Sequence, residues 1–161
     1  MTPLGDLWLV WSAQGLVAVR WPEQGPAEDG PTERVVPRHY AEPLGRYFDG
    51  KPVDPALLAV DLRGSAFQVR VWEALRQVRR GTVRTYAGIA ADVGSPRAMR
   101  AVGAANGKNP IPVVVPCHRI VEAGHRLGGY SGGLERKRLL LELEGVRVEQ
   151  GRVLPGQLDL L

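Results

Sequence analysis

The sequence has little of what disulfides and metal sites require. It contains a single cysteine, Cys117, so an intramolecular disulfide is excluded, which fits a reducing compartment. The three histidines, His39, His118 and His125, are not spaced as zinc ligands, either with one another or with Cys117. We therefore expect neither a metal site nor a cofactor.

Long apolar runs are also missing. No segment approaches the roughly 20 apolar residues of a membrane-spanning helix, and residues 1–10 lack the basic start and apolar stretch of a secretion signal. The 161 residues are enough for one or two small domains with cores of their own. We expect a cytoplasmic protein that has no membrane partner.

Positive charge, by contrast, is concentrated in the middle of the chain. The net charge of +4 divides into −4 for residues 1–62 (5 basic, 9 acidic), +7 for residues 63–110 (9 basic, 2 acidic) and +1 for residues 111–161 (7 basic, 6 acidic). A segment so rich in positive charge is typical of proteins that bind a polyanion, above all nucleic acid. The alternative is an ordinary solvated surface.

The first third of the chain predicts a small α+β unit. Two apolar runs, 7–11 and 16–21, flank a Ser-Ala-Gln-Gly tetrapeptide and predict an antiparallel hairpin. Residues 22–37 predict a loop, residues 39–48 a short helix and residues 56–62 a further strand. We expect no catalytic residue in this unit, and we assign its tryptophans to a core.

Three helices are expected in the middle of the chain. A capping box that starts at Ser65 predicts the first, which runs to Gly81. Thr85 opens the second, and the third covers residues 95–106, with a serine as N-cap and a proline at its first position. The tight Gly-Ser-Pro turn between the second and third helices makes them a helix-turn-helix candidate.

The third of these helices has a slim, cationic surface. Arg97 and Arg100 project from it, whereas most of its other positions hold small residues, namely Ala98, Ala101, Gly103, Ala104 and Ala105. Such a helix can approach a duplex closely, even in the minor groove, which is only about 6 Å wide and displays a degenerate code. Binding of that kind has little sequence preference. The alternative is that the alanines permit close packing on the core.

The chemistry is expected at Cys117 and His118. The apolar run of residues 113–115 predicts a short buried strand, which Pro116 ends because proline has no N–H to donate. A thiol there is held in place yet can be reached, and a nearby imidazole with surrounding arginines lowers its pKa toward neutrality. Because adjacent side chains point apart, we expect His118 to act through a water or after a backbone turn. The alternative is a structural, buried thiol.

Six motifs follow one another in the second part of the chain. They are Gly81-Thr82-Val83-Arg84-Thr85-Tyr86, Arg100-Ala101-Val102-Gly103, Asn109-Pro110, Pro116-Cys117-His118-Arg119, Gly129-Tyr130-Ser131-Gly132-Gly133 and Leu141-Glu142-Leu143-Glu144-Gly145. In order and spacing they resemble the O6-alkylguanine-DNA alkyltransferases, densely over residues 64–146 and loosely before. The resemblance implies an α+β protein with a ribonuclease-H-like domain over residues 1–62. A winged helix-turn-helix domain over residues 63–161 would carry the cysteine.

The resemblance implies a role for each matching residue. Cys117 would accept the alkyl group, His118 would be its base through a water, and Glu144 would orient and polarise His118. Asn109 would brace the turn before the cysteine, a job close to that of any turn asparagine before a proline. Tyr86 would donate a hydrogen bond to N3 of the flipped guanine and crowd the rotated phosphate.

Residues that bind DNA and line a pocket also follow from the resemblance. Arg100 would enter the base stack in place of the extruded base. The other expected DNA-binding residues are Arg97, Ala98, Ala101, Ala105 and Arg119, together with Tyr86. The expected substrate pocket consists of Pro112, Ile120, Gly128, Tyr130, Ser131 and Gly132. Ser131 would donate at O6, and the glycines would leave room for alkyl groups larger than methyl unless they serve only positive-φ backbone.

The implied function is direct reversal of DNA damage. O6-alkylguanine, or O4-alkylthymine, would be flipped out of double-stranded DNA, and its alkyl group would move irreversibly to Cys117. No second cysteine exists to take the group over, so each monomer would act once, as a methylated-DNA-protein-cysteine methyltransferase. Two alternatives remain. A winged-helix regulator that binds DNA without chemistry would have no need of Cys117, and a cysteine hydrolase would turn over repeatedly.

Overall fold

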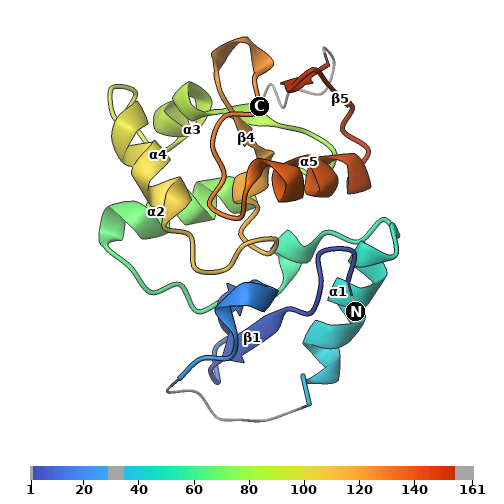
Figure 1. Ribbon diagram of the computed structural model, residues 1–161. Helices are drawn as coiled ribbons and strands as arrows, with labels where there is room; N and C mark the ends of the chain where they lie inside the picture. The colour runs from blue at the N-terminus through green and yellow to red at the C-terminus, as the bar shows by residue number, and fades with distance from the viewer. Residues whose placement is uncertain (1, 29–34, 155–161) are drawn as a thin grey trace.

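The computed structural model describes residues 2–28 and 35–154 as short helices and strands in two neighbouring parts (Figure 1). Within these ranges no helix is both long and apolar enough to span a membrane. The residues before about 60 lie below the rest of the chain in Figure 1, yet both parts share one apolar core. That core includes the buried side chains of Leu16, Tyr47, Leu75 and Ile111.

The predicted hairpin and helix of the first part are both present. Strand β1 (Trp8–Trp11) pairs antiparallel with β2 (Leu16–Arg20). Helix α1 (Arg38–Phe48) buries one apolar face, and a 3-10 turn, η1 (Pro22–Gln24), occupies the start of the predicted loop. Residues 29–34 of that loop lie outside the described residues.

The strand predicted over residues 56–62 is wrong. Residues Pro55–Leu57 form a 3-10 turn, η2, because the Asp54 side chain caps it by accepting from Ala56 N at 3.0 Å and the proline favours its first position. Beyond it, Val60 makes only a single parallel bridge to Leu16.

Helix α2 (Ala66–Arg76) begins as predicted and ends early. Ser65 Oγ accepts from Gln68 N at 3.2 Å, and Gln68 Oε1 accepts from Ser65 N at 2.9 Å, which completes the capping box. The predicted run to Gly81 is too long. The backbone leaves the helix after Arg76, and its carbonyl at Val78 accepts from Arg119.

Two short helices follow, and the second begins later than predicted. Thr85 caps α3 (Tyr86–Asp92) by accepting from Gly88 N at 3.0 Å. Helix α4 (Met99–Gly107) starts four residues after Ser95, so the predicted serine N-cap is wrong. Ser95 O instead accepts from Ala98 N at 2.8 Å, because serine followed by proline also favours a tight turn.

The remaining elements surround the end of the second part. Strand β3 (Arg84–Thr85) pairs in parallel with β4 (Ile120–Val121). Helix α5 (Leu134–Leu143) follows, and β5 (Val148–Glu149) forms a hairpin with β6 (Arg152–Val153). A second, smaller apolar cluster, which includes Leu141, lies here.

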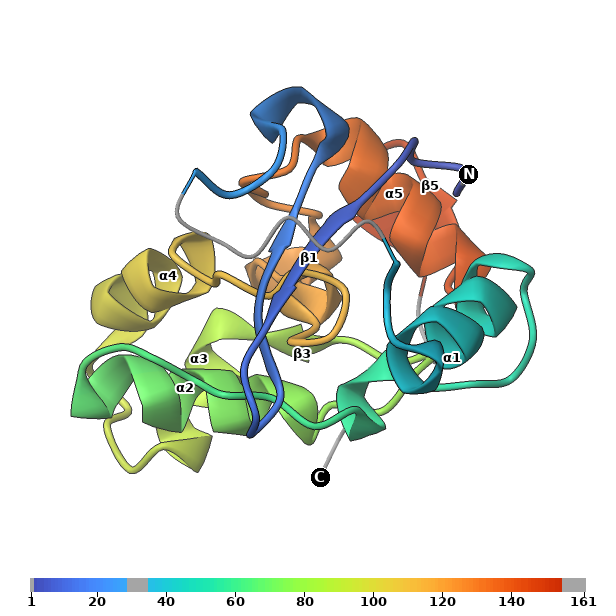
Figure 2. The same cartoon turned by 90° about the horizontal axis from the view of Figure 1, so that it is seen from below.

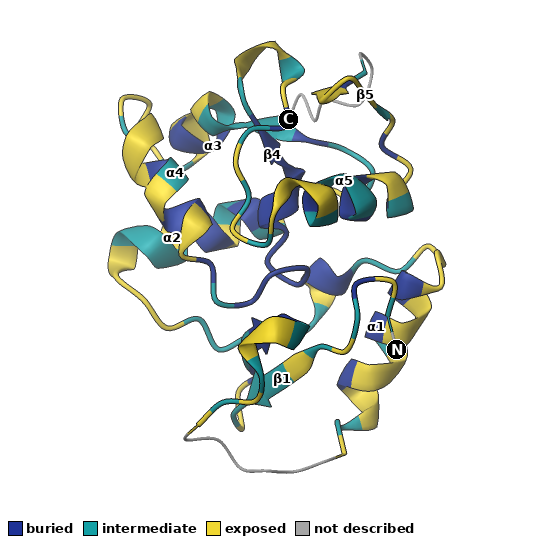
Figure 3. Ribbon diagram, in the orientation of Figure 1, coloured by how far each residue is buried: buried dark blue, intermediate teal, exposed yellow. Residues whose placement is uncertain are grey.

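The valine run is buried, but it is not a strand. Residues 113–115 form a turn in which Val115 N donates to Ile111 O at 2.8 Å and Val113 has a positive φ of 73°. Prolines precede and follow this run, and they remove the donors that a sheet would use. Residues 111–121 are all buried and cross the middle of the molecule (Figure 3).

The first hairpin packs directly against this central segment. From below, β1 lies in front of the segment that leads to the cysteine (Figure 2). Val19 N donates to Pro110 O at 2.9 Å, so the hairpin is hydrogen-bonded to the segment that positions the site.

Candidate active site and DNA-facing helix

Cys117 is held by Asn109 in the middle of the molecule. Asn109 Nδ2 donates to Cys117 Sγ at 3.0 Å and to Val115 O at 2.7 Å, while its Oδ1 accepts from Ile111 N at 2.9 Å. The hydrogen bonds predicted to brace the turn are therefore present. The sequence analysis missed the direct contact with the thiol.

The thiol is less accessible and less acidic than predicted. Only 1% of Cys117 is exposed, so the expectation of a thiol that can be reached directly is wrong. Burial raises the pKa of Cys117, although the hydrogen bond from Asn109 and the charge of Lys137 oppose that rise. The predicted pKa near neutrality is also wrong, because apolar neighbours disfavour the thiolate. In this conformation the thiol is held protonated at neutral pH.

His118 faces Glu144 and makes no hydrogen bond to Cys117. Its Nε2 lies 2.8 Å from Glu144 Oε1, while its Nδ1 is buried without a partner among the described residues. Burial lowers the pKa of His118, and Glu144 only partly offsets this effect. A neutral imidazole that donates Nε2–H to Glu144 leaves Nδ1 as an acceptor; this tautomer is assigned from the hydrogen bonds.

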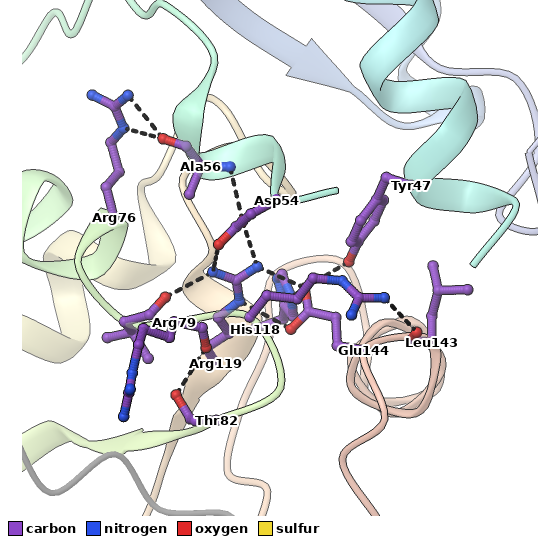
Figure 4. Close-up of polar contacts among 12 residues, drawn as sticks. Tyr47, Asp54, Ala56, Arg76, Arg79, Thr82, His118, Arg119, Leu143 and Glu144 are labelled. Atoms are coloured by element: carbon purple, nitrogen blue, oxygen red, sulfur yellow. Dashed lines mark hydrogen bonds and ion pairs between the residues drawn. The ribbon is translucent and has the colours of Figure 1, made fainter. Parts of the chain in front are cut away.

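Glu144 is the centre of a buried polar network (Figure 4). Its Oε1 accepts from Tyr47 Oη at 2.7 Å and from Arg119 Nη2 at 2.9 Å, in addition to His118. Its Oε2 accepts from Arg119 Nε at 2.9 Å. Burial would raise the pKa of Glu144, but His118 and Arg119 together hold it well below its ordinary value. The carboxylate is therefore a fixed anion at neutral pH.

Arg119 belongs to this network and not to a DNA surface. Its side chain is fully buried, and besides Glu144 it binds Asp54 Oδ1 at 2.9 Å and Val78 O at 2.7 Å. The prediction that Arg119 contacts DNA is wrong, because its guanidinium is already paired inside the protein.

Residues 1–62, in which no catalytic residue was expected, nevertheless contribute side chains that support the site. Tyr47 and Asp54 both come from this part and bond directly to the network at Glu144 and Arg119 (Figure 4). Tyr47 lies among apolar positions of a short helix, and Asp54 precedes a proline. Neither pattern distinguishes a structural residue from one that contacts a site.

Lys137 is a further residue that the sequence analysis missed. It is fully buried, and its Nζ donates to the carbonyls of Ile120, Leu127 and Gly129, the last at 3.2 Å. Burial lowers its pKa to about 8. These bonds tie α5 to β4 and to the loop before Tyr130. In the sequence Lys137 lies between two arginines, so the pattern indicates only a charged surface.

The expected pocket residues differ in how far they are exposed. Pro112 and Ile120 are buried, Ser131 is exposed, and the buried hydroxyl of Tyr130 has no hydrogen-bond partner among the described residues. Burial, and next the nearby Cys117 thiol, raise the pKa of Tyr130 well above its ordinary value. The phenol therefore stays protonated beside the thiol.

Gly132 does not provide the free space that was predicted for a large alkyl group. A Cβ at this position would lie 2.8 Å from Tyr130 Cε1 and 3.0 Å from the Trp21 ring. The prediction is wrong because two aromatic rings already fill that volume. Gly128 combines a positive φ of 68° with close contact to Glu122, so its role is conformational.

Trp21 and Glu23, from the first part of the chain, belong to an aromatic and ionic cluster that packs against the loop around Tyr130. Trp21 contacts Tyr130 edge-on with ring centroids 6.4 Å apart, and the guanidinium carbon of Arg136 lies 4.7 Å from the Trp21 ring centroid. Arg136 also pairs with Glu23 through two bonds of 2.6 and 2.8 Å. Trp21 thus packs against the loop as well as the core.

Helix α4 and the turn before it present four of the predicted DNA-binding residues at least partly to solvent. Arg97, Arg100 and Ala101 are exposed and Ala98 is half-buried. Ala105 is only 2% exposed, so the prediction that it contacts DNA is wrong: it packs on the core. Met99, which was not predicted, is 51% exposed beside Arg100.

Tyr86 lies at the start of α3, next to α4. A Cβ at Gly103 would lie 4.0 Å from its ring, which places the two helices in contact. The ring is half-buried, and burial, followed by the nearby Cys117 and Glu122, raises its pKa. Among the described residues, no group of three or more His, Cys, Asp or Glu side chains could hold a metal ion.

Comparisons with known proteins identify the family. The family model described as 6-O-methylguanine DNA methyltransferase, DNA binding domain, matches residues 66–146. The methylated-DNA-protein-cysteine methyltransferase of Mycolicibacterium paratuberculosis is 47% identical over 148 residues, which cover 89% of this chain and 88% of that protein. That of Salmonella typhimurium is 39% identical, with 89% and 92% covered.

A solved structure agrees with these relatives. The mixed α/β fold matches Mycobacterium tuberculosis OGT in complex with DNA with a TM-score of 0.76 and 41% identity, over 89% of this chain and 88% of that one. The resemblance seen in the sequence motifs is thereby confirmed. The chain belongs to the methylated-DNA-protein-cysteine methyltransferase family.

Proposed function

We propose that this protein repairs O6-alkylguanine in double-stranded DNA by moving the alkyl group to Cys117. The observation that carries the proposal is a buried thiol held by Asn109, next in the sequence to an imidazole that Glu144 orients, in a chain of this family. O4-alkylthymine offers the same kind of alkyl–oxygen bond and is a second substrate under the proposal.

The proposed reaction begins with proton transfer. His118 Nδ1 has no partner among the described residues, so it accepts the thiol proton through a bridging water. The thiolate then attacks the alkyl carbon, the bond from that carbon to O6 breaks, and its electron pair stays on guanine. Tyr86 donates a hydrogen bond at N3, and Ser131 donates at O6, where negative charge develops.

The product explains why each chain acts once. An S-alkyl cysteine is a thioether, and the sequence has no second cysteine to accept the alkyl group. Burial raises the pKa of the thiol, and this also limits its reaction with other electrophiles until the flipped guanine occupies the pocket.

DNA binding is assigned to the α3–α4 pair. The target base has to leave the stack to reach a buried thiol, at a cost of a few kcal/mol. Arg100 offsets that cost by filling the space in the stack, while Arg97, Ala98 and Ala101 follow the minor groove. Contacts of this kind give little sequence preference.

The finer description of the fold belongs to the same proposal. The packing of α3 on α4 and the pairing of β3 with β4 support a winged helix-turn-helix unit over residues 63–161. The hairpin and α1 support a ribonuclease-H-like unit over residues 1–62. We propose that the protein acts as a monomer in the cytoplasm.

Counting repaired bases tests the proposal. With duplex O6-methylguanine in excess, the number of guanines restored per chain should level off at one. Cys117→Ser should restore none and still bind the duplex. A count that keeps rising would contradict transfer to a single thiol, and a count of zero for the parent protein would favour one of the two alternatives, a regulator without chemistry or a cysteine hydrolase of other substrates.

A further inference from the structure

Tyr47 connects the first part of the chain to the proton-transfer residues. Its side chain is fully buried in α1, 97 positions before Glu144, and its hydroxyl donates to Glu144 Oε1 at 2.7 Å. The same oxygen lies 2.8 Å from His118 Nε2 (Figure 4). Tyr47 and His118 therefore share one acceptor atom.

Sharing an acceptor weakens each of the bonds made to it. A hydrogen-bond donor draws negative charge toward itself, so the hydroxyl of Tyr47 reduces the charge that Glu144 Oε1 presents to His118. Burial, and then the neighbouring Glu144, raise the pKa of Tyr47 well above its ordinary value. The phenol therefore stays protonated around neutral pH and donates this hydrogen bond.

We propose that Tyr47 is a positioning residue that sets the proton affinity of His118 through Glu144. The role in proton removal from Cys117 rests on the proposed function, whereas the effect on the imidazole does not. In this way Tyr47, which lies in the part of the chain without a reacting group, changes the proton affinity of His118, the base of the proposed reaction.

Every other charged group around the pair stays in place when only this hydroxyl is removed. Arg119 still donates to both oxygens of Glu144, and Asp54 still binds the far side of Arg119. Two further charged groups near the network are Arg80, whose Nη2 donates to Leu143 O at 3.2 Å, and Lys137 on α5. Tyr47→Phe therefore isolates a single hydrogen bond.

The direct test is a titration of His118 by NMR. The chain has only three histidines, so protein labelled with 15N-histidine gives three ring systems, and His118→Gln identifies the one of interest. In Tyr47→Phe the pKa of His118, read as its titration midpoint, should rise by up to about one pH unit, because one hydrogen bond to a charged group is worth about that much and acts on His118 through Glu144. Tyr40→Phe, a buried tyrosine of the same helix outside the network, should leave it unchanged.

Two results would overturn the proposal. One is an unchanged or lowered midpoint in Tyr47→Phe, and the other is an equal rise in Tyr40→Phe. If Tyr47→Phe does not fold, 3-fluorotyrosine placed at position 47 keeps the ring and makes the hydroxyl a stronger donor. The midpoint for His118 should then fall, and a rise or no change would contradict the proposal.

The pH dependence of alkyl transfer provides a second readout. His118 acts as a base only when neutral, so the acid limb of the rate profile should move to higher pH in Tyr47→Phe, by the same amount as the NMR midpoint. A uniform loss of rate at all pH values would indicate a merely structural role. The NMR titration needs no alkyl transfer, so a parent protein that fails to react would overturn the proposed function and leave this test intact.

Discussion

The two parts of the molecule meet at one site and contribute to it differently. Residues 63–154 carry the thiol of Cys117, the imidazole of His118 and the exposed cations on α4 and in the turn before it. The described residues of the first part carry none of these groups, yet Tyr47 and Asp54 bond to the buried network. The first part of the chain thus contributes hydrogen bonds to the network around Glu144 without contributing a reacting group. Side-chain substitutions in each part should show which residues stabilise the buried network and which take part in alkyl transfer.

The largest effect should come from removing Arg119. Arg119→Met would leave Glu144 buried without its main cation and should lower the free energy of unfolding by about 3–5 kcal/mol. Asp54→Asn should cost about 1 kcal/mol, because the side chain of Asp54 is 23% exposed to water. Urea unfolding measures both.

Arg138→Met is the matched control for this comparison. Arg138 makes only surface ion pairs, so its loss should change stability by less than about 0.5 kcal/mol. Similar losses for Arg119→Met and Arg138→Met would show that the buried network does not hold the two parts together.

Acid should weaken the same network. Burial opposes the ionised form of Glu144, but His118 and Arg119 favour it more strongly and lower its pKa. A carboxyl group with a lowered pKa in the folded state stabilises the protein above its unfolded pKa of about 4.3 and loses that contribution as the pH falls below it. The free energy of unfolding should therefore decrease from about pH 5 downward.

Glu144→Gln tests whether this carboxylate is responsible. The variant should be less stable at pH 7 and should lose less stability in acid. The difference in free energy of unfolding between variant and parent should therefore narrow between about pH 5 and pH 2. Parallel curves over that range would assign the acid loss to other groups.

Disturbing the packing of Trp21 and Tyr130 at Gly132 should have an intermediate effect on the rate of alkyl transfer. Gly132→Ala should slow alkyl transfer by about tenfold, because the added Cβ would contact Trp21 and Tyr130 too closely. Gly129→Ala, where a Cβ meets nothing within 4 Å, is the control. Adding Trp21→Leu to Gly132→Ala should recover part of the rate, and failure to do so would argue against a role for the first part here.

The smallest effect should appear at the exposed surface of α4. Arg100→Ala should slow repair in a duplex by about threefold and leave reaction with free O6-methylguanine unchanged, because a free base needs no flipping. Met99→Ala, at the exposed neighbour, controls for a general loss of helix surface. An equal loss on duplex and free base would show that Arg100 does not replace the flipped base.

Local signals predicted much of the fold. The hairpin, α1 and the caps at Ser65 and Thr85 follow from alternation, periodicity and capping, all of which act within a few residues. The valine run misled because its β-propensity was overridden by the surrounding prolines and by tertiary burial. The position of α4 was wrong by a few residues, because serine followed by proline starts turns and helices equally well.

Only the site residues that lie within the sequence motifs could be predicted. Cys117, His118 and Glu144 follow from the motif resemblance, and the structure brings His118 within 2.8 Å of Glu144, whereas His118 makes no hydrogen bond to Cys117. Tyr47 and Lys137 could not be predicted, because a contact across 97 residues and a lysine folded inward leave no local pattern. Arg119 was assigned to DNA because nothing in the sequence shows where Asp54 lies.

Peptide mass mapping after reaction tests the central claim most directly. The protein is incubated with duplex DNA that contains O6-methylguanine and then digested, and the peptides are compared with those of unreacted protein. The account predicts one added methyl group per chain, located on Cys117 and absent in Cys117→Ser. A methyl group on any other residue, or restored guanine with no modified peptide, would contradict it.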